Sequence, residues 1–282
     1  MIKKLTYKMK PPGSARLQKG RSVGNGIAGG WFMRENSGDE LNDFSGHNTI
    51  GTIIGATWTD TKFGRGLDFD AFNDRVDCGN PAILQTQAMS LVVWARPESN
   101  SKSIVTKGDQ SRGNANQRDW DLFGSGADLR FLVSTGAGWI LNLGVGSGFP
   151  TLNQHHQFVV TWDGTTTVGG GNIYVDGSLW ATGTATGTSN ANNFNLFIGG
   201  RRTAGTHYEF DGQIDHVIIY DHALIYSEVK LIYNRPFYIF DRPARPLYHI
   251  AAGGPPPAQQ SFMDLSTMYW TVEKASGLLT RL

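Results

Sequence analysis

Apolar and polar residues alternate along several short runs of the chain, which is the pattern expected of β-strands. The alternation is clearest at residues 90–96, 129–133, 139–145, 158–162 and 214–220. The last run carries apolar side chains on both faces. Its alternation places Ile214, His216, Ile218 and Tyr220 on one side and Asp215, Val217 and Ile219 on the other. We therefore predict that this run is a central strand.

Turns and one helix complete the predicted elements. Asp176-Gly177 lies between two apolar runs and predicts a two-residue hairpin turn, because both positions tolerate positive φ. Apolar residues at 229, 232 and 233 form one helical stripe, which Pro236 ends. The polar run from Lys107 to Asp119 is too long for a tight turn and predicts an exposed loop.

The composition fits one large β-rich domain. The 282 residues are 39% hydrophobic and include 36 glycines without a Gly-X-Y period, which indicates many turns. Cys78 is the single cysteine, so the chain has no intrachain disulfide, and we expect its thiol to be buried.

The N-terminal region has an unusual charge. Residues 1–34 contain eight Lys or Arg and no acid, whereas the rest has 17 basic against 24 acidic residues. In residues 1–23 the apolar residues follow neither a helical nor a strand period, so we predict an extended arm. Because the arm is basic, we expect it to contact acidic protein partners or, as a weaker alternative, nucleic acid. A solvated terminus is the plainer alternative. The predicted contact residues are Lys3, Lys4, Lys8, Lys10 and Arg16.

No targeting or membrane segment is expected. Met1-Ile-Lys-Lys begins like a secretory signal, but no apolar stretch follows it, so we predict no signal peptide. No apolar run has the length of a membrane span.

The C-terminal region changes character after Pro236. Residues 236–282 begin with a proline-rich extended segment, which Gly253–Pro257 separates from a last apolar stripe. A stripe cut off from the domain core needs a partner, so we predict a docking tail, with an unstructured tail as the alternative. Its predicted contacts are Phe262, Leu265, Met268, Tyr269 and Trp270.

Two stretches of sequence resemble a known family. Residues 210–224 read Phe-Asp-Gly-Gln-Ile-Asp-His-Val-Ile-Ile-Tyr-Asp-His-Ala-Leu, followed by Glu228-Val229. Upstream lie Trp31–Gly38, Asp43-Phe-Ser-Gly, Phe63–Asp70 and Asn73–Asp77. This pattern resembles laminin-G-like jelly rolls of the concanavalin A-like lectin/glucanase superfamily. The resemblance implies an all-β antiparallel sandwich with one short helix over residues 24–235, flanked by the arms 1–23 and 236–282.

The same resemblance implies a calcium site. In that family an Asp of an early loop and the first Asp of the closing strand commonly approach one ion, which takes six to eight oxygen ligands. Here the ligands would be Asp43, Thr49 and Asp215. The alternative is that Asp43 caps a turn and Asp215 pairs with a basic group or a backbone amide.

Carbohydrate chemistry is the other candidate. Aromatic rings stack on sugars, and several lie near polar loop residues, although most tryptophans of a sandwich are core residues. The predicted contacts are Trp120, Trp139, Arg201, Arg202, His207 and Tyr208. Glu209 and Asp211 are the sole hint of a hydrolytic carboxylate pair, and Ile214 stands where a third carboxylate is usual in glucanases of this superfamily.

The flanks of the predicted domain also carry a resemblance. Gly26-Ile-Ala-Gly-Gly-Trp31 and Tyr233-Asn-Arg-Pro-Phe-Tyr-Ile-Phe240 look like the flanks of laminin-G-domain proteins of tailed-phage virions. We therefore predict a non-enzymatic virion protein, made in the host cytoplasm, that decorates a capsid or belongs to a tail. It would contact other virion proteins and further copies of itself. A carbohydrate-binding or receptor-recognition module is the alternative, and a glycoside hydrolase is the third.

Overall fold

The structure is a computed structural model that describes residues 9–12, 15–85, 87–108, 118–135, 138–146, 148–189, 194–200 and 208–240. All of them belong to one compact unit, Lys4–Pro243. Several predicted contact residues lie outside the described ranges: Lys3, Lys4, Lys8, Arg201, Arg202, His207, Phe262, Leu265, Met268, Tyr269 and Trp270.

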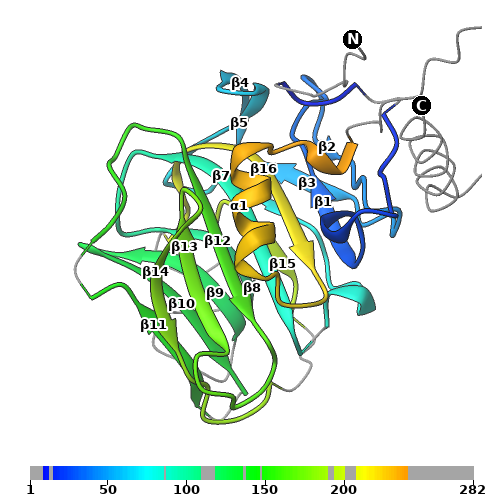
Figure 1. Cartoon of the computed structure of the whole chain (residues 1–282). Coiled ribbons are helices and arrows are strands. Elements are labelled where there is room, and N and C mark those ends of the chain that lie inside the picture. Colours follow the sequence, from blue (N-terminus) through cyan, green and yellow to red (C-terminus); the bar gives the residue numbers. More distant parts are fainter. Residues whose placement is uncertain are drawn as a thin grey trace, which may run out of the picture. The chain divides into compact units, whose positions relative to one another are not determined.

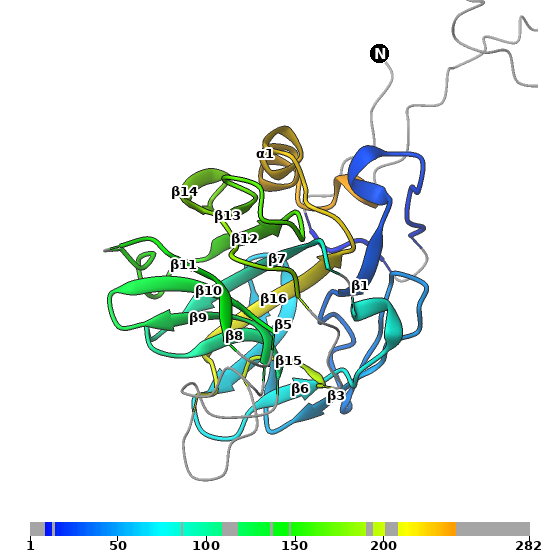
Figure 2. The same ribbon diagram turned by 90° about the horizontal axis from the view of Figure 1, so that it is seen from below.

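Two antiparallel sheets, each of eight strands within the described residues, face one another (Figures 1 and 2). The first sheet has the order β14 (Ser178–Gly183), β13 (Gly171–Val175), β12 (His156–Trp162), β7 (Met89–Pro97), β16 (Asp211–Tyr220), β5 (Gly64–Asp70) and β4 (Thr57–Thr61), and β1 (Ile27–Trp31) also pairs with β16. The second has the order β11 (Trp139–Gly144), β10 (Asp128–Ser134), β9 (Arg118–Ser125), β8 (Ser103–Gly108), β15 (Leu196–Ile198), β6 (Arg75–Asp77), β3 (Gly51–Ile54) and β2 (Glu40–Leu41). The predicted all-β sandwich is confirmed.

The predicted strands and turn are present. The five alternating runs lie in β7, β10, β11, β12 and β16. Between β13 and β14, Asp176 and Gly177 have φ values of 50° and 69°. Two successive residues with positive φ make the tight hairpin turn expected from Asp-Gly.

Strand β16 is central, as predicted, but its facing differs from simple alternation. It pairs with β7 on one side, and with β5 and then β1 on the other. A bulge between Ile214 and His216 breaks the register with β7. Ile214 consequently packs with Val217 in the core between the sheets, and not on the face of His216 as predicted. A bulge re-aims the side chains beside it.

The outer face of the first sheet is covered (Figure 2). The helix α1 (Tyr226–Asn234) buries Val229 and Ile232 against it, which confirms the predicted stripe. Phe237 and the 3-10 helix η4 (Tyr238–Phe240) add further apolar side chains to the same cluster. The N-terminal residues 9–12 and 15–26, called the strap below, contribute Leu17 and Val23. The strap thus belongs to the apolar cluster that covers this outer face.

The prediction of an exposed loop from Lys107 to Asp119 is wrong for the two end residues, which lie in strands. Lys107 belongs to β8 and Asp119 to β9, and they are 0% and 4% exposed. The Lys107 Nζ and Asp119 Oδ2 atoms are 2.6 Å apart. Polarity predicted a loop because the sequence cannot show that these opposite charges neutralise each other within the sandwich.

Candidate functional site

Asp43 caps the loop 43–50, called the Asp43 loop below. Its Oδ1 accepts hydrogen bonds from the backbone N–H groups of Gly30 (2.9 Å) and Ser45 (2.8 Å). Its Oδ2 accepts from the Ser45 hydroxyl (2.7 Å) and from the Thr49 backbone N–H (3.1 Å). Both carboxylate oxygens therefore have protein donors, and the loop is folded around them.

Asp215 lies at the bulge of β16 and is fully buried. It accepts a hydrogen bond from the Thr61 hydroxyl, and its Oδ2 lies 3.0 Å from Nδ1 of His155. The Lys10 ammonium is 3.9 Å from its Oδ1. Burial opposes ionisation, but the His155 hydrogen bond and the charge of Lys10 lower the pKa of Asp215. This carboxylate is one member of a charged pair.

These surroundings do not fit the predicted calcium site. Among the residues that the structure describes, Asp43 and Asp215 have no hydrogen-bond or ionic partner in common. An ammonium group beside Asp215 would repel a cation. No group of three or more His, Cys, Asp or Glu side chains in the described ranges is arranged to hold a metal. The residues present instead match the alternative of a turn cap and an ion pair.

Of the three aromatic residues among the predicted sugar contacts, one lies in the core and two are partly buried. Trp120 is 5% exposed and packs in the core between the sheets, so it offers no ring face to a ligand. Trp139 and Tyr208 are partly buried. Trp180 has 39% exposure on the edge strand β14, at a register irregularity opposite Ile173 and Tyr174. A bulge cannot be read from the alternation, so the sequence did not indicate this ring.

The two predicted contact residues of the N-terminal arm that the structure describes, Arg16 and Lys10, differ in exposure. Arg16 is exposed, as a partner contact requires. The Lys10 side chain is 5% exposed, and burial lowers its pKa to about 8 although Asp215 opposes the change. Lys10 is therefore a buried anchor, and the prediction that it contacts a partner or nucleic acid is wrong.

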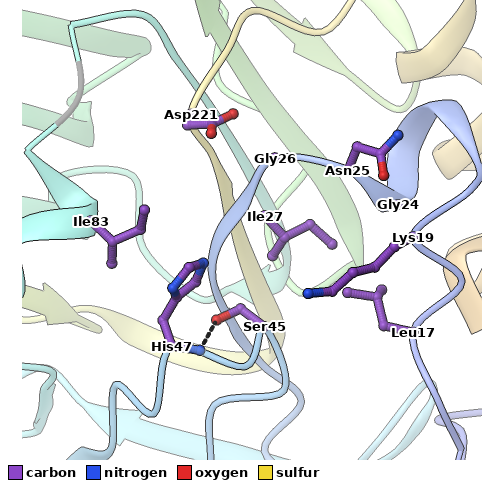
Figure 3. Close-up of a pocket in the computed structure, with 10 residues that line it drawn as sticks. All are labelled: Leu17, Lys19, Gly24, Asn25, Gly26, Ile27, Ser45, His47, Ile83 and Asp221. Atoms are coloured by element: carbon purple, nitrogen blue, oxygen red, sulfur yellow. Dashed lines mark hydrogen bonds between the residues drawn. The ribbon is translucent and has the colours of Figure 1, made fainter.

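A pocket of about 260 Å³ lies between the strap, the Asp43 loop and the end of β16 (Figure 3). Its lining comprises Leu17, Lys19, Gly24, Asn25, Gly26, Ile27, Ser45, His47, Ile83 and Asp221. Figure 3 shows that Lys19 from the strap and His47 from the Asp43 loop reach toward it from different elements. Strap residues therefore make up half of the lining.

The loop geometry places the polar groups of this pocket. The Ser45 hydroxyl donates to Asp43 and accepts from the backbone N–H of His47 (3.2 Å), which fixes the base of the His47 side chain. At Gly26 (φ 65°) the backbone passes so close to Asp221 that a Cβ there would lie 2.3 Å from its Oδ1. That oxygen is also 2.9 Å from Nδ1 of His222.

The pocket lining, as far as the structure describes it, contains hydrogen-bond donors and acceptors, but it has one carboxylate where hydrolysis ordinarily needs two. Lys19, Asn25 and His47 carry N–H groups, Asp221 accepts hydrogen bonds, and Leu17, Ile27 and Ile83 are aliphatic. Asp221 is the one carboxylate among the described lining residues. Glycoside hydrolysis ordinarily requires two. Glu209, half of the predicted hydrolytic pair, is 5% exposed and does not line this pocket.

The sequence did not predict the pocket, because its lining comes from four separate regions. The sequence resemblance included both the Asp43 motif and the closing strand, but it implied a calcium site at Asp43 and no pocket beside it. The side chains of the Asp43 loop that line the pocket are those of Ser45 and His47. Only the three-dimensional path of the strap shows that Lys19 joins them.

A known protein family matches a large part of this sandwich. Residues 70–230, more than half of the chain, match the laminin-G family described as the concanavalin A-like lectin/glucanases superfamily. The chain belongs to this superfamily. The match begins at the end of β5 and ends within α1. Eight of the ten pocket residues precede the matched region, so the pocket lies largely outside the part common to the family.

Solved structures of this superfamily fold show the same architecture at low identity. Domain 4 of AbnA, a GH43 extracellular arabinanase from Geobacillus stearothermophilus in complex with arabinotriose, is 17% identical with a TM-score of 0.57. That match covers 73% of this chain and 97% of the AbnA domain. The binding domain of Paraclostridial Mosquitocidal Protein 1 is 14% identical with a TM-score of 0.60, over 76% of this chain and 53% of the other.

A sialidase from Trypanosoma rangeli in complex with sialic acid is 16% identical with a TM-score of 0.56. The match covers 76% of this chain but 33% of the sialidase, so the chain spans about a third of that protein's length. The TM-scores show a common fold, and at such low identity the matches show nothing beyond the fold. A search of curated proteins gave no match. In the described ranges, no helix combines the length and apolar character needed to cross a membrane.

Proposed function

We propose that this chain is a non-enzymatic, lectin-like recognition protein and that its pocket binds a saccharide. The observation that carries the proposal is the composition of the pocket: charged, amide and imidazole groups surround a small space that also has aliphatic walls. Sugars present hydroxyl groups and C–H faces, which match such a lining. The volume, about 260 Å³, is near the lower end of ligand pockets (~300–1,000 Å³) and suits one sugar ring.

The superfamily fold supports this function without determining it. The match to the arabinanase domain covers 97% of that domain, and the bound arabinotriose is a property of that domain. For this chain, the single carboxylate of the pocket favours binding over hydrolysis. A saccharide would accept hydrogen bonds from Lys19 and donate to Asp221.

The test is a glycan microarray probed with the full chain. We expect binding to a restricted set of saccharides, and Asp221→Asn or Lys19→Met should weaken it at least about tenfold, the loss expected for one charged hydrogen bond. Matched controls are Asp60→Asn and Lys62→Met, which change exposed residues away from the pocket. No binding by the full chain, or equal losses in pocket and control variants, would contradict the proposal.

The same saccharides test the absence of catalysis. Incubation of the full chain with each bound saccharide should release no reducing end. Turnover that disappears in Glu209→Gln would overturn the non-enzymatic assignment and favour the glycoside hydrolase alternative.

A virion is the setting we propose for this recognition, with other virion proteins and further copies of the chain as partners. The support is that the two phage-like flanks form one packed unit. Ile27 of the first flank lies in the same buried apolar cluster as Phe237 and Phe240 of the second. The two flanking stretches therefore belong to one packed unit of the fold.

Particle incorporation tests the setting. A chain lacking residues 258–282 should remain folded and bind glycans, but should be absent from purified particles when these are analysed by mass spectrometry. Normal incorporation of this truncation would remove the proposed role of the C-terminal tail. A chain that never copurifies with particles would remove the virion assignment.

A further inference from the structure

The bulge in β16 creates a small acidic socket on the outer side of the first sheet. It lies where β16 changes its partner from β5 to β1. The Asp215 carboxylate is 0% exposed, and its Oδ1 also lies 3.4 Å from the backbone N–H of Phe63. A carboxylate without access to water requires a positive partner or several donors, because desolvation of an unpaired charge is costly.

Lys10 of the strap occupies this socket. Its Nζ donates to the backbone carbonyls of Met33 (3.5 Å) and Arg65, and lies 3.9 Å from Asp215 Oδ1. An ammonium has three N–H groups, so these two carbonyls and the carboxylate match its donors. The Lys10 backbone N–H also donates to the Phe63 carbonyl (3.2 Å). The arrangement suits a primary ammonium on a flexible stem, which is a compact charge with three donors, whereas a guanidinium presents its donors in one plane.

The strap continues from the socket toward the pocket. The Arg34 guanidinium donates to the Pro11 carbonyl (2.8 Å), and the backbone N–H of Gln18 donates to the carbonyl of Ile239 (2.8 Å). The Tyr220 hydroxyl donates to the Val23 carbonyl (3.1 Å). Between these contacts the strap supplies Leu17 and Lys19 to the pocket. Of these three hydrogen bonds, the one from Arg34 has a charged donor. The strap's buried pair of opposite charges is that of Lys10 and Asp215.

We infer that Asp215 and its neighbouring carbonyls form a site for a primary alkylammonium group, and that Lys10 bound there positions the strap as one wall of the pocket. Lys10 and Asp215 are thus positioning residues for the ligand, although neither touches the pocket. The consequence for ligand binding rests on the proposed function; the ammonium site itself does not.

The first measurement is amide hydrogen exchange of the full chain, followed by mass spectrometry. Lys10→Ala should raise exchange in residues 15–24 about tenfold or more, because the strap opens more often. Lys62→Ala is the matched control: its ammonium also lies on the outer side of the first sheet, 4.6 Å from the Trp94 ring centroid, but outside the socket. Unchanged strap exchange in Lys10→Ala would overturn the inference.

Chemical rescue tests the class of ligand. n-Butylammonium chloride should restore slow exchange of the strap in Lys10→Ala, whereas n-butanol, which lacks the charge, and guanidinium at the same concentration should not. Equal rescue by butanol would show that the socket selects an apolar stem and would contradict an ammonium site. Asp215→Asn should show fast strap exchange that butylammonium does not correct, and rescue in this variant would also contradict the assignment.

Glycan binding separates this inference from the proposed function. If Lys10→Ala loses array binding and butylammonium restores it, the socket positions the pocket wall. Rescue of exchange together with unchanged array binding would contradict the positioning role. If the unmodified chain binds no glycan, the proposed function fails, while the exchange and rescue results still decide whether the ammonium site exists.

Discussion

Asp43 and Asp215 belong to the two stretches of sequence that resemble the family, yet the protein uses their carboxylates differently. Asp43 sits in a loop and accepts hydrogen bonds from three backbone N–H groups and one hydroxyl. Asp215 sits in a strand at zero exposure and faces an ammonium and an imidazole. The first holds a loop by neutral donors, and the second balances charge inside the fold. Residue type alone does not distinguish these roles.

The largest effect should come from Asp215→Ala. The change leaves the Lys10 ammonium buried without its carboxylate, and removal of one partner of a buried pair typically costs about 3–5 kcal/mol. Urea unfolding monitored by tryptophan fluorescence measures the loss. Asp60→Ala provides the control, because its side chain is 87% exposed beside Arg65 and should change stability by about 0–1 kcal/mol. Similar losses in the two variants would remove the distinction between buried and exposed pairs.

The neighbourhood of Asp215 should also make stability fall in acid. Burial and the nearby Lys10 charge lower the pKa of His216 from 6.5 to about 3, and Asp215 opposes them. Between these values the unfolded chain binds a proton at this position and the folded chain does not, so stability falls as the pH drops from about 6.5 toward 3. The slope from one such group is at most about 1.4 kcal/mol per pH unit.

His216→Phe should flatten that slope, since a phenyl ring has no proton to bind and the site already contains Phe63 and Phe237. Unfolding free energies measured at several pH values compare the two proteins. Other acidic groups add to the slope in both, so the difference between the curves is the relevant quantity. Parallel curves would show that His216 does not titrate on unfolding.

Asp43→Ala should have a smaller effect than Asp215→Ala. It removes the acceptor for the N–H groups of Gly30, Ser45 and Thr49, and unsatisfied buried donors cost about 1–3 kcal/mol. The Asp43 loop carries Ser45 and His47, so glycan binding should decline as well. Asp43→Asn retains an amide oxygen and should recover part of both losses. Full stability of Asp43→Ala would show that the loop holds its shape without this cap.

The smallest expected effect is that of calcium. Because both oxygens of Asp43 have donors and Asp215 has a cationic partner, addition of calcium or of a chelator should leave the melting temperature unchanged. A rise with calcium that disappears in Asp43→Ala would revive the predicted metal site and show that the loop rearranges to bind it.

Local signals predicted the fold well. The Asp176-Gly177 turn was assigned correctly, and the apolar residues of β16 correctly indicated a central strand, although its bulge places Ile214 on the other face from the one predicted. Errors arose where a side chain meets a distant partner. Lys107 is polar and looked exposed, but Asp119 neutralises it inside the sandwich. Lys10 looked like part of a free arm because the sequence contains no sign that the bulge at Asp215 would receive it.

The site was harder to predict for the same reason. Its lining joins Leu17, His47, Ile83 and Asp221, which no local period connects. The Asp43 motif lies in a loop that lines this pocket, although the sequence indicated a metal site there. Trp120 shows the converse error, since an aromatic residue near polar sequence was assigned to the surface while its strand turns the ring into the core.

The position of β16 has a consequence for the route by which the chain reaches its native state. This strand lies between β7 and the pair β5 and β1, so early strands acquire a neighbour that is synthesised much later. The hydrogen bond from Tyr220 to Val23 closes a separation of 197 residues. Strand pairing over such a long range costs loop-closure entropy before the contacts can stabilise the fold. Proteins rich in such contacts fold slowly. During synthesis, β1 and β5 must therefore remain with unpaired edges until β16 emerges, which is the period when a nascent chain is most exposed to misassociation.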